Sequence, residues 1–382
     1  MEKIRVGVVG LGHRGRKMFE TAIKLFDYLV PAAACDLKPS NFYEKQFNSD
    51  DSISNQFPDA VFYESYDEML EKANLDVVMV MTGADVHASF CIKALEKNIN
   101  VFSEIPNVAT LKEAEDLWKA HLNSKAMIST GANPNESKFS VLLQDFYRNG
   151  LLGKPYCMEA EYIHCVHPGS AESVYLYENG DWRKLLSPIR YCTHSLGPLL
   201  TIVNEDLRKV SCFGTGLHAD YDKISLREKD DMMCANFQTD SGIVIRLMRN
   251  GRCRAKIGYH SYRVFGTEGY MERMDRFDKP VIRYNSTKEL DKDLKEIGGE
   301  NMPPQYANDE ALLKYDLHGG MDYALLKHYF EAVKNGDPAP ISLKEGLRMT
   351  LPGIYAEESA KRGGEVMRMY YPWDEDWSAE FR

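Results

Sequence analysis

The first third of the chain alternates short apolar runs with stretches whose apolar residues recur every three to four positions. The apolar runs predict β-strands, and the stretches between them predict helices over residues 66–73, 85–97 and 110–123. The predicted strands lie at residues 4–10, 29–36, 60–65, 76–83, 100–106 and 126–131. Strands that alternate with helices indicate an α/β fold with a doubly wound parallel sheet. Asp85 is the predicted N-cap of the helix that follows it.

The rest of the chain follows a different pattern, in which apolar and polar side chains alternate along strand-length segments. These segments lie at residues 153–166, 208–216, 232–250 and 255–271. The alternation is typical of antiparallel strands with one face toward a core and one toward solvent. Asn250-Gly251 predicts a hairpin, and the weak pattern over 285–319 predicts a long loop. Basic residues flank the predicted hairpin, and the alternation favours a solvated strand face for them over a phosphate site. They are Arg249, Arg252, Arg254, Lys256 and Arg263.

Composition and charge exclude several classes of partner. The net charge is −10, from 47 Lys and Arg against 57 Asp and Glu, and such a surface repels phosphate backbones, so we expect no nucleic-acid partner. No apolar run approaches the ~20 residues that cross a bilayer, and Met1 runs almost directly into the first strand, so we expect neither a membrane partner nor a secretory signal. The eight cysteines form no CxxC pair, which favours reduced thiols and a cytoplasmic location.

The turn after the first predicted strand carries the pattern Gly10-x-Gly12-x-x-Gly15. In a dinucleotide site the first glycine permits the tight turn, the second lets the backbone approach the pyrophosphate, and the third lets the helix pack near the strand. The helix then presents free N–H groups and the positive end of its dipole to the phosphates. A glycine turn without a ligand is the weaker alternative, because a strand precedes this turn and a helix follows it.

Residues near the ends of the predicted strands complete the expected cofactor site. Asp36 ends the second strand, where a carboxylate accepts hydrogen bonds from an adenosine ribose and repels a 2′-phosphate, so the expected cofactor is NAD rather than NADP. Lys38 and Arg14 lie nearby and weaken this preference. His87 is expected to contact the edge of the cofactor, and a surface histidine or a hydrogen-bonded histidine without a ligand is an equal alternative. The other expected cofactor contacts are His13, Arg14, Thr82 and Glu104.

In these motifs the chain resembles the Gfo/Idh/MocA family of oxidoreductases. The matching stretches are "GVVGLGHRG" (7–15), "MTGADVHASFCIKALEKNINVFSEIP" (81–106), "VFGTEGYM" (264–271) and "ISLKEGLRMTLPGIYAEESAKRGG" (341–364). The resemblance implies a Rossmann domain at 1–130 and a second α+β domain at 131–382, with a large, mostly antiparallel sheet. It also implies a homo-oligomer, a dimer or tetramer built through that sheet.

The proton-transfer groups of this family are altered in the chain. Many dehydrogenases that resemble the family carry Glu-Lys-Pro where this chain has Glu104-Ile105-Pro106. They also carry an aspartate four residues before a histidine; here the histidine is His194 and the earlier position is Arg190. Ile105 neither donates a hydrogen bond nor moves a proton. An ordinary alcohol dehydrogenase is therefore in doubt.

The NAD-dependent glycoside hydrolases, typified by bacterial α-N-acetylgalactosaminidase, resemble the chain better. They share the apolar residue between that Glu and Pro. Three further matches are Tyr191-x-x-His194-x-x-Gly197-Pro198, Tyr162-Ile163-His164 and His318-Gly319-Gly320-Met321-Asp322. Residues 130–139 depart from the acidic, cysteine-rich stretch of that branch, which leaves the substrate and one catalytic group open.

The resemblance implies redox-neutral cleavage of a carbohydrate. Hydride transfer from C3 to NAD⁺ acidifies the C2–H bond, the anomeric group leaves by elimination, water adds, and the hydride returns. His194 is expected to exchange the proton of the C3 hydroxyl, with Tyr191 sharing that task, and Tyr162 to remove the C2 proton. The expected substrate contacts are Trp182, Arg183, Arg190 and His318. No metal is expected, because His164, Cys165 and His167 lack a fourth ligand.

Other functions of the protein, and structural roles for two of the expected site residues, stay open. The chain is alternatively a net NAD(P)-dependent dehydrogenase of a sugar or polyol, or a non-catalytic dinucleotide-binding sensor. For Tyr162 the alternative is a buried, hydrogen-bonded tyrosine, and for His318 a simple turn residue. Accumulation of NADH would select the dehydrogenase, and cofactor binding without isotope exchange would select the sensor.

Overall fold

The computed structural model describes residues 3–46, 49–163, 186–217, 230–250, 260–276, 279–289, 293–298 and 318–381. They form two compact units, each described here by itself. Unit 1 comprises residues 1–132, 306–347 and 378–382, and unit 2 comprises residues 133–305 and 348–377. The boundary predicted after residue 130 lies close to the change of unit after Ala132, whereas residues 306–347 group with unit 1.

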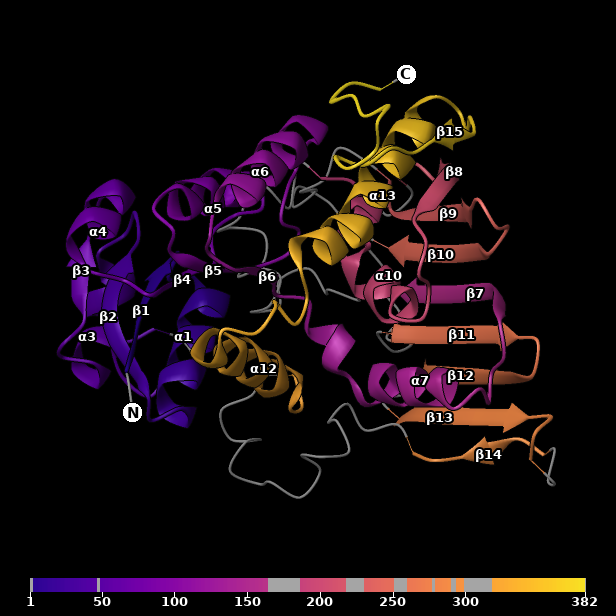
Figure 1. The fold of residues 1–382 in the computed structure, drawn as a ribbon, viewed down its shortest axis with the longest axis horizontal. Helices are drawn as coiled ribbons and strands as arrows, with labels where there is room; N and C mark the ends of the chain where they lie inside the picture. Colours follow the sequence, from indigo (N-terminus) through magenta and orange to yellow (C-terminus); the bar gives the residue numbers. More distant parts are fainter. Residues whose placement is uncertain are drawn as a thin grey trace. The chain divides into compact units, whose positions relative to one another are not determined.

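In its described residues, unit 1 contains a six-stranded parallel sheet in the order β3-β2-β1-β4-β5-β6 (Figure 1). The strands are β1 Ile4–Val9, β2 Leu29–Cys35, β3 Val61–Tyr63, β4 Val77–Val80, β5 Asn100–Ser103 and β6 Ile128–Thr130. The helices between them are α1 His13–Leu25, α2 Ser40–Tyr43, α3 Ile53–Gln56, α4 Tyr66–Lys72, α5 His87–Glu96 and α6 Leu111–Asn123. The predicted doubly wound sheet is confirmed, and its order reverses between β1 and β4, where such folds bind ligands.

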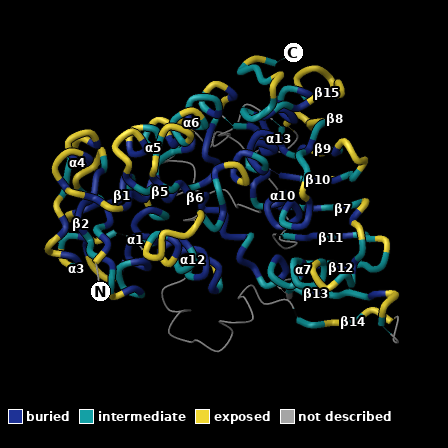
Figure 2. The backbone as a smooth tube through the Cα atoms, viewed as in Figure 1, coloured by how far each residue is buried: buried dark blue, intermediate teal, exposed yellow. Residues whose placement is uncertain are grey.

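The strands of this sheet are apolar because helices cover them. All four residues of β4 are buried, and Figure 2 shows the central strands as buried backbone. The predicted N-cap of α5 is wrong: the helix begins at His87 after Val86, and no side chain caps it. The N–H groups of this helix end are therefore not taken by Asp85, which precedes the cap position by one residue.

A segment from late in the sequence completes unit 1. Helix α12 (Met321–Asn335) packs on α1, where Phe26 stacks on Tyr323 with ring centroids 5.7 Å apart. The chain then reaches β6, where the Thr130 N–H donates to the Ile341 carbonyl at 2.8 Å. Helical periodicity alone does not indicate which sheet a helix covers, and the sequence analysis did not predict this return.

Across its described strands, unit 2 forms a nine-stranded sheet in the order β14-β13-β12-β11-β7-β10-β9-β8-β15. Only β7 and β10 pair in parallel among these neighbours, so the predicted mostly antiparallel sheet is confirmed. The strands are β7 Pro155–Tyr162, β8 Leu207–Gly214, β9 Met232–Thr239, β10 Val244–Asn250, β11 His260–Gly266, β12 Gly269–Arg276, β13 Lys279–Ser286, β14 Lys295–Glu296 and β15 Met367–Arg368.

For unit 2, one prediction from the sequence is wrong in part and another lies partly outside the described residues. The loop predicted over 285–319 is wrong at its start, since β13 extends to Ser286 and the short strand β14 pairs with it. The predicted hairpin at Asn250-Gly251 lies partly outside the described residues, because only Asn250 is described. Among the helices that are described, none is both long and apolar enough to cross a membrane.

Helices cover one face of the unit 2 sheet. They are the short η1 (Asn133–Glu136) and η2 (Pro188–Tyr191), together with α7 Lys138–Arg148, α10 Thr193–Leu200 and the greater part of α13 Leu343–Lys361. Helix α10 packs on β7 and β11, and the Tyr262 hydroxyl donates to the His194 carbonyl at 2.7 Å. The chain thus brings the start of α10 onto the centre of the sheet.

Replacing Thr110 by Ala tests a local determinant of unit 1. The Thr110 side chain accepts a hydrogen bond from the Glu113 N–H at 3.1 Å, and the Glu113 carboxylate accepts from the Thr110 N–H at 3.1 Å, which is a capping box. Thr110→Ala should lower the free energy of unfolding by about 1 kcal/mol, measured by urea unfolding. Thr110→Ser keeps the acceptor and should unfold like the parent; equal losses in both variants would contradict a capping role.

Candidate active site

The glycine turn of unit 1 has the geometry that a dinucleotide requires. Gly10 has φ +89°, and a Cβ there would lie 2.7 Å from the Met81 carbonyl oxygen. A Cβ at Gly15 would lie 1.9 Å from the Gly10 carbonyl oxygen. Gly12 is the N-cap of α1 and has no side chain to take the first N–H groups of the helix. The turn is therefore closely packed behind and open in front, which fits a pyrophosphate at the helix N-terminus.

Asp36 connects the end of β2 to this turn. Its Oδ2 accepts a hydrogen bond from the Leu11 N–H at 2.6 Å, and its Oδ1 accepts from the Lys38 N–H at 2.8 Å and from Asn41 Nδ2 at 3.1 Å. The carboxylate thus stands where an adenosine ribose is expected. A hydrogen bond from the ribose to Asp36 stays a prediction.

Arg14 is held by two carboxylates. Its Nη1 and Nη2 lie 2.6 and 2.8 Å from the two carboxylate oxygens of Asp322, and its Nε lies 2.8 Å from Glu104 Oε1. The side chain of Asp322 is only 3% exposed. Burial alone would raise the pKa of the Asp322 carboxyl, but the Arg14 guanidinium and His318 outweigh it and hold that pKa well below its usual range.

These contacts direct the charge of Arg14 toward protein groups. A guanidinium that is bound by one carboxylate through two nitrogens and by a second through Nε makes strong charge-assisted hydrogen bonds. Arg14 therefore links the glycine turn to β5 and α12, and a direct contact with the cofactor stays a prediction. Its neighbour His13 has a lowered pKa, because burial and the nearby Arg16 and Lys17 disfavour the imidazolium.

His318 joins the same network from the segment before α12. Its Nδ1 lies 2.7 Å from Asp322 Oδ2, and its side chain is 43% exposed. Because the ionised Asp322 only accepts hydrogen bonds, this contact assigns the proton of a neutral ring to Nδ1. Gly319 and Gly320 have φ of +64° and +91°, which lets the chain turn into the helix immediately afterwards. The structure thus places His318 beside Asp322 and Arg14 with part of its ring exposed, and its contact with substrate stays a prediction.

The loops after β4 and β5 are joined through His87. The ring is buried, and its Nδ1 and Nε2 each lie 2.8 Å from a carbonyl oxygen, those of Pro106 and Thr82 respectively. A histidine whose two ring nitrogens contact backbone carbonyls positions these loops. This agrees with the alternative in which His87 is hydrogen-bonded within the protein and contacts no ligand. Glu104 Oε2 accepts from the Ile105 N–H at 3.1 Å.

Ile105 is packed into the apolar interior of unit 1. Its side chain is only 3% exposed. No proton-transfer group therefore comes from this position, as the sequence predicts. The proton-handling groups of the proposed chemistry must come from other residues.

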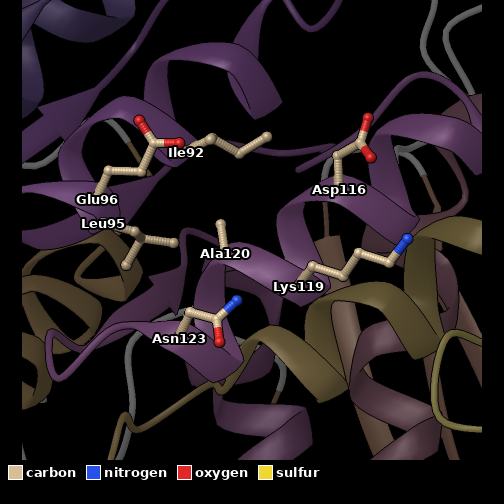
Figure 3. A pocket seen from close by; sticks show the side chains of 7 residues that line it. All are labelled: Ile92, Leu95, Glu96, Asp116, Lys119, Ala120 and Asn123. Carbon is tan, nitrogen blue, oxygen red and sulfur yellow. The ribbon is translucent and has the colours of Figure 1, made fainter.

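A hollow on the surface of unit 1 lies apart from these groups. It measures about 310 Å³ and is lined by residues of α5 and α6, including Leu95, Lys119 and Asn123 (Figure 3). These residues belong to the last turns of the two helices. In a βα unit the helix begins at the carboxyl edge of the sheet and ends toward the opposite edge, so this hollow is not the cofactor site.

Unit 2 brings the predicted catalytic side chains together. The ring centroids of Tyr162 and His194 are 5.4 Å apart, those of Tyr191 and His194 4.9 Å, and those of Tyr162 and Tyr191 6.5 Å. Tyr162 ends β7, whereas Tyr191 and His194 lie on η2 and α10. Two phenols and an imidazole from separate elements thus form one cluster on the helix-covered face of the sheet.

Two further residues of this cluster were missed by the sequence analysis. His260 stacks on Tyr162 with ring centroids 4.3 Å apart, and the Arg249 guanidinium carbon lies 4.0 Å from the Tyr162 ring centroid. Arg249 is only 4% exposed, so its predicted place on a solvated strand face is wrong. By alternation Arg249 shares the face of the buried Ile245 and Leu247, and Asn250, which follows it, is buried as well. A basic residue in phase with the buried Leu247 was the available signal.

Of the other predicted substrate contacts, Arg190 is described by the structure and forms an ion pair within the protein. Arg190 is buried, and its Nη1 lies 3.3 Å from Glu357 Oε2, while Ser187 donates to Glu357 Oε1 at 2.8 Å. This pairing fixes η2 against α13, and a substrate contact of Arg190 stays a prediction. Trp182, Arg183 and the histidine and cysteine residues at 164, 165 and 167 lie outside the described residues.

The Arg14–Asp322 pair predicts a pH-dependent contribution to stability. A carboxyl whose pKa is depressed on folding stabilises the fold above its unfolded pKa, about 4, and this stabilisation is lost as the pH falls below that value. Asp322→Asn should therefore cost on the order of 3 kcal/mol at pH 7, and the difference from the parent protein should shrink as the pH approaches 3.

The matched control is Asp67→Asn, which removes the exposed partner of Lys93. It should cost less than about 1 kcal/mol. Urea unfolding between pH 3 and pH 7 measures both effects. A difference between the parent and Asp322→Asn that stays constant over this range would show that charge pairing is not the cause.

Comparisons with known proteins agree with this geometry. Residues 4–132 match the model of the Gfo/Idh/MocA family, described as an oxidoreductase family with an NAD-binding Rossmann fold. A glycosyl hydrolase family 109 protein of Shewanella pealeana is 22% identical over 382 residues, which cover 94% of this chain and 83% of that protein. The α-N-acetylgalactosaminidase of Shewanella oneidensis is 24% identical over 390 residues, with the same shares covered.

A solved structure extends the likeness to the whole fold. Levoglucosan dehydrogenase in complex with NADH superimposes with a TM-score of 0.78 at 14% identity, covering 97% of this chain and 100% of that one. Both units therefore have the architecture of this structural neighbour. The resemblance predicted from the sequence is confirmed, because residues 4–132 match the model of the Gfo/Idh/MocA oxidoreductase family with its NAD-binding Rossmann fold.

Proposed function

We propose that this protein is an NAD-dependent enzyme that cleaves a glycoside without net oxidation, through transient oxidation at C3 and elimination across C1 and C2. The observation that carries the proposal is the Tyr162, Tyr191 and His194 cluster of unit 2, combined with an apolar Ile105 in unit 1. The curated relatives that are named as glycosidases support the substrate class.

The residues have distinct proton-transfer roles in this proposal. His194 accepts the proton of the C3 hydroxyl while Tyr191 hydrogen-bonds the same oxygen, and Tyr162 as phenolate removes the proton at C2. Bound NAD⁺ would take the hydride from C3 and return it at the end of the cycle. The C1–O bond then breaks with its electron pair on the leaving oxygen, which takes up a proton, and water adds to C1 of the enone with the proton returning to C2.

This scheme has a different requirement from that of ordinary glycosidases. Those enzymes place two carboxylates on either side of the scissile bond. Elimination next to a ketone needs instead a base at C2 and a group that handles the C3 hydroxyl proton. The cluster of unit 2 supplies phenol and imidazole for these two tasks.

An aryl-glycoside panel with and without NAD⁺ tests the proposal. We expect NAD⁺-dependent release of the aglycone without accumulation of NADH, and deuterium at C2 of the sugar product formed in D₂O. His194→Ala and Tyr191→Phe should each lower the rate at least about 100-fold while the dissociation constant for NAD⁺ changes little.

The alternatives give different results in the same assay. Stoichiometric NADH with a free sugar or polyol would select a net dehydrogenase, the activity named in the levoglucosan dehydrogenase neighbour. Binding of NAD⁺ without any exchange at C2 or C3 would select a non-catalytic sensor. Normal rates in both variants would overturn the assignment of the site.

We further propose that the protein assembles as a homo-oligomer through the outer face of the unit 2 sheet. Side chains of six strands form one row of alternating charge across that face, following the strand register. The row consists of Glu296, Arg283, Glu272, Arg263, Glu159 and Arg246. Within it, Glu159 lies 2.7 Å from Arg263 and 2.9 Å from Arg246.

Apolar side chains flank this charged row on both sides. One flanking row contains Phe213, Cys234 and Met248 and continues on β7 with Glu161, and the other contains Val244, Cys157, Phe265 and Tyr270. These side chains are exposed or half-buried within unit 2. A charge-paired row between apolar rows suits contact with a second copy, because the charges already have partners and the apolar area remains to be buried.

Met248→Asp tests the oligomer. A carboxylate in the flanking row next to Glu161 should repel a second copy, so light scattering should show a smaller species than for the parent protein. Leu122→Asp is the control, because it adds the same charge at an exposed apolar residue of α6. A monomeric parent protein at micromolar concentration would contradict the proposal.

A further inference from the structure

Strand register places three side chains in one row across the centre of the unit 2 sheet. Strand β7 lies between β10 and β11, Arg249 pairs with Tyr162 across β10 and β7, and His260 pairs with Tyr162 across β11 and β7. Because these neighbours belong to strands on either side of β7, they flank the phenol ring from opposite sides. The contact distances agree, with the Arg249 guanidinium carbon 4.0 Å and the His260 ring centroid 4.3 Å from the Tyr162 ring centroid.

The guanidinium of Arg249 is held in this position by backbone. Its Nη1 donates to the Tyr162 carbonyl oxygen at 3.2 Å and to the carbonyl of Asn250. The Arg249 side chain thus connects its own strand, β10, to β7, the strand of Tyr162. A cation that is fixed on the face of a ring is attracted by the ring and favours the ionised form of the phenol. It acts against the burial of Tyr162, which is only 8% exposed, because burial favours the neutral form.

We propose that Arg249 is a positioning residue that keeps a cation on the ring of Tyr162 and thereby makes this phenol a base near neutral pH. The inference deepens the proposed function and rests on it for the role of the phenolate. The phenol must lose its proton to act at C2, and an ordinary tyrosine loses it only near pH 10. An opposite charge within about 6 Å typically changes a pKa by 1–3.

Among the residues that the structure describes, the other titratable groups around the phenol come from three elements. His260 faces it from β11, Tyr191 from η2 and His194 from α10. Arg249 also lies 5.8 Å from the Tyr191 ring, so the same cation acts more weakly on the second phenol. Substitutions at Arg249 leave these groups in place, and a difference between variants then reports the guanidinium.

The experiment observes the phenol itself. Full-length protein labelled with ¹³Cζ-tyrosine is titrated by NMR, and Tyr162→Phe assigns the resonance. We expect the parent Tyr162 to titrate well below 10, and its pKa to rise by at least about 1 in Arg249→Met and in Arg249→Gln. The Gln variant keeps an N–H donor for the Tyr162 carbonyl, so it covers the case in which the Met variant does not fold.

Arg249→Lys and Arg148→Met are the matched controls. Lysine restores the positive charge, so the pKa of Tyr162 in Arg249→Lys should lie close to that of the parent protein. Arg148→Met removes a cation from an exposed pair with Asp145 on α7 and should leave Tyr162 unchanged. A parent Tyr162 that titrates at or above 10, or that is unaffected in both neutral variants, overturns the inference.

Kinetic measurements connect the inference to the reaction. They also distinguish a failure of the inference about Arg249 from a failure of the proposed function. In Arg249→Gln the acidic limb of the kcat/KM profile should move to higher pH by the same amount as the Tyr162 pKa, which lowers the rate about tenfold at neutral pH for a change of 1. NAD⁺ affinity should not change. If the Tyr162 pKa is lowered but the protein acts on no glycoside, the inference about Arg249 stands and the proposed glycosidase function is refuted.

Discussion

The register of β7 between β10 and β11 is the constraint on which unit 2 depends. It aligns Arg249, Tyr162 and His260 on the helix-covered face. The same register aligns the charged row through Glu159 on the other face. Side chains of a strand alternate between faces, so a slip of one residue would exchange the two sets. The phenol cluster and the outer surface therefore follow from a single set of backbone hydrogen bonds.

Unit 1 has a comparable dependence on the Arg14–Asp322 pair. These side chains are 308 positions apart in the sequence, yet they form a bidentate ion pair beside the glycine turn. The pair gives the guanidinium partners within the protein and holds the start of α12 next to the turn. His318 reaches the same place because two glycines with positive φ join it to the helix. Burial of Asp322 makes the arrangement costly to break, since a buried charge without its partner is strongly unfavourable.

The chemistry proposed here follows from what these two arrangements contain. Unit 1 has a buried Ile105 where a lysine would handle protons, and its nearby charges are paired with one another. Unit 2 has phenol, imidazole and guanidinium groups in mutual contact. In the proposed reaction the residues of unit 1 bind the dinucleotide, and those of unit 2 transfer the protons.

The sequence by itself determined the features that depend on neighbours in the chain. Gly10, Gly12 and Gly15 specify the turn, the apolar runs specify the parallel strands, and Tyr191 and His194 lie only three residues apart in the sequence. The tertiary structure alone decided which distant residues meet. It placed Asp322 on Arg14, buried Arg249 against Tyr162, and added α12 to unit 1. Local periodicity records which face of an element is apolar, but the partner of that face is chosen by packing and strand pairing across the whole chain.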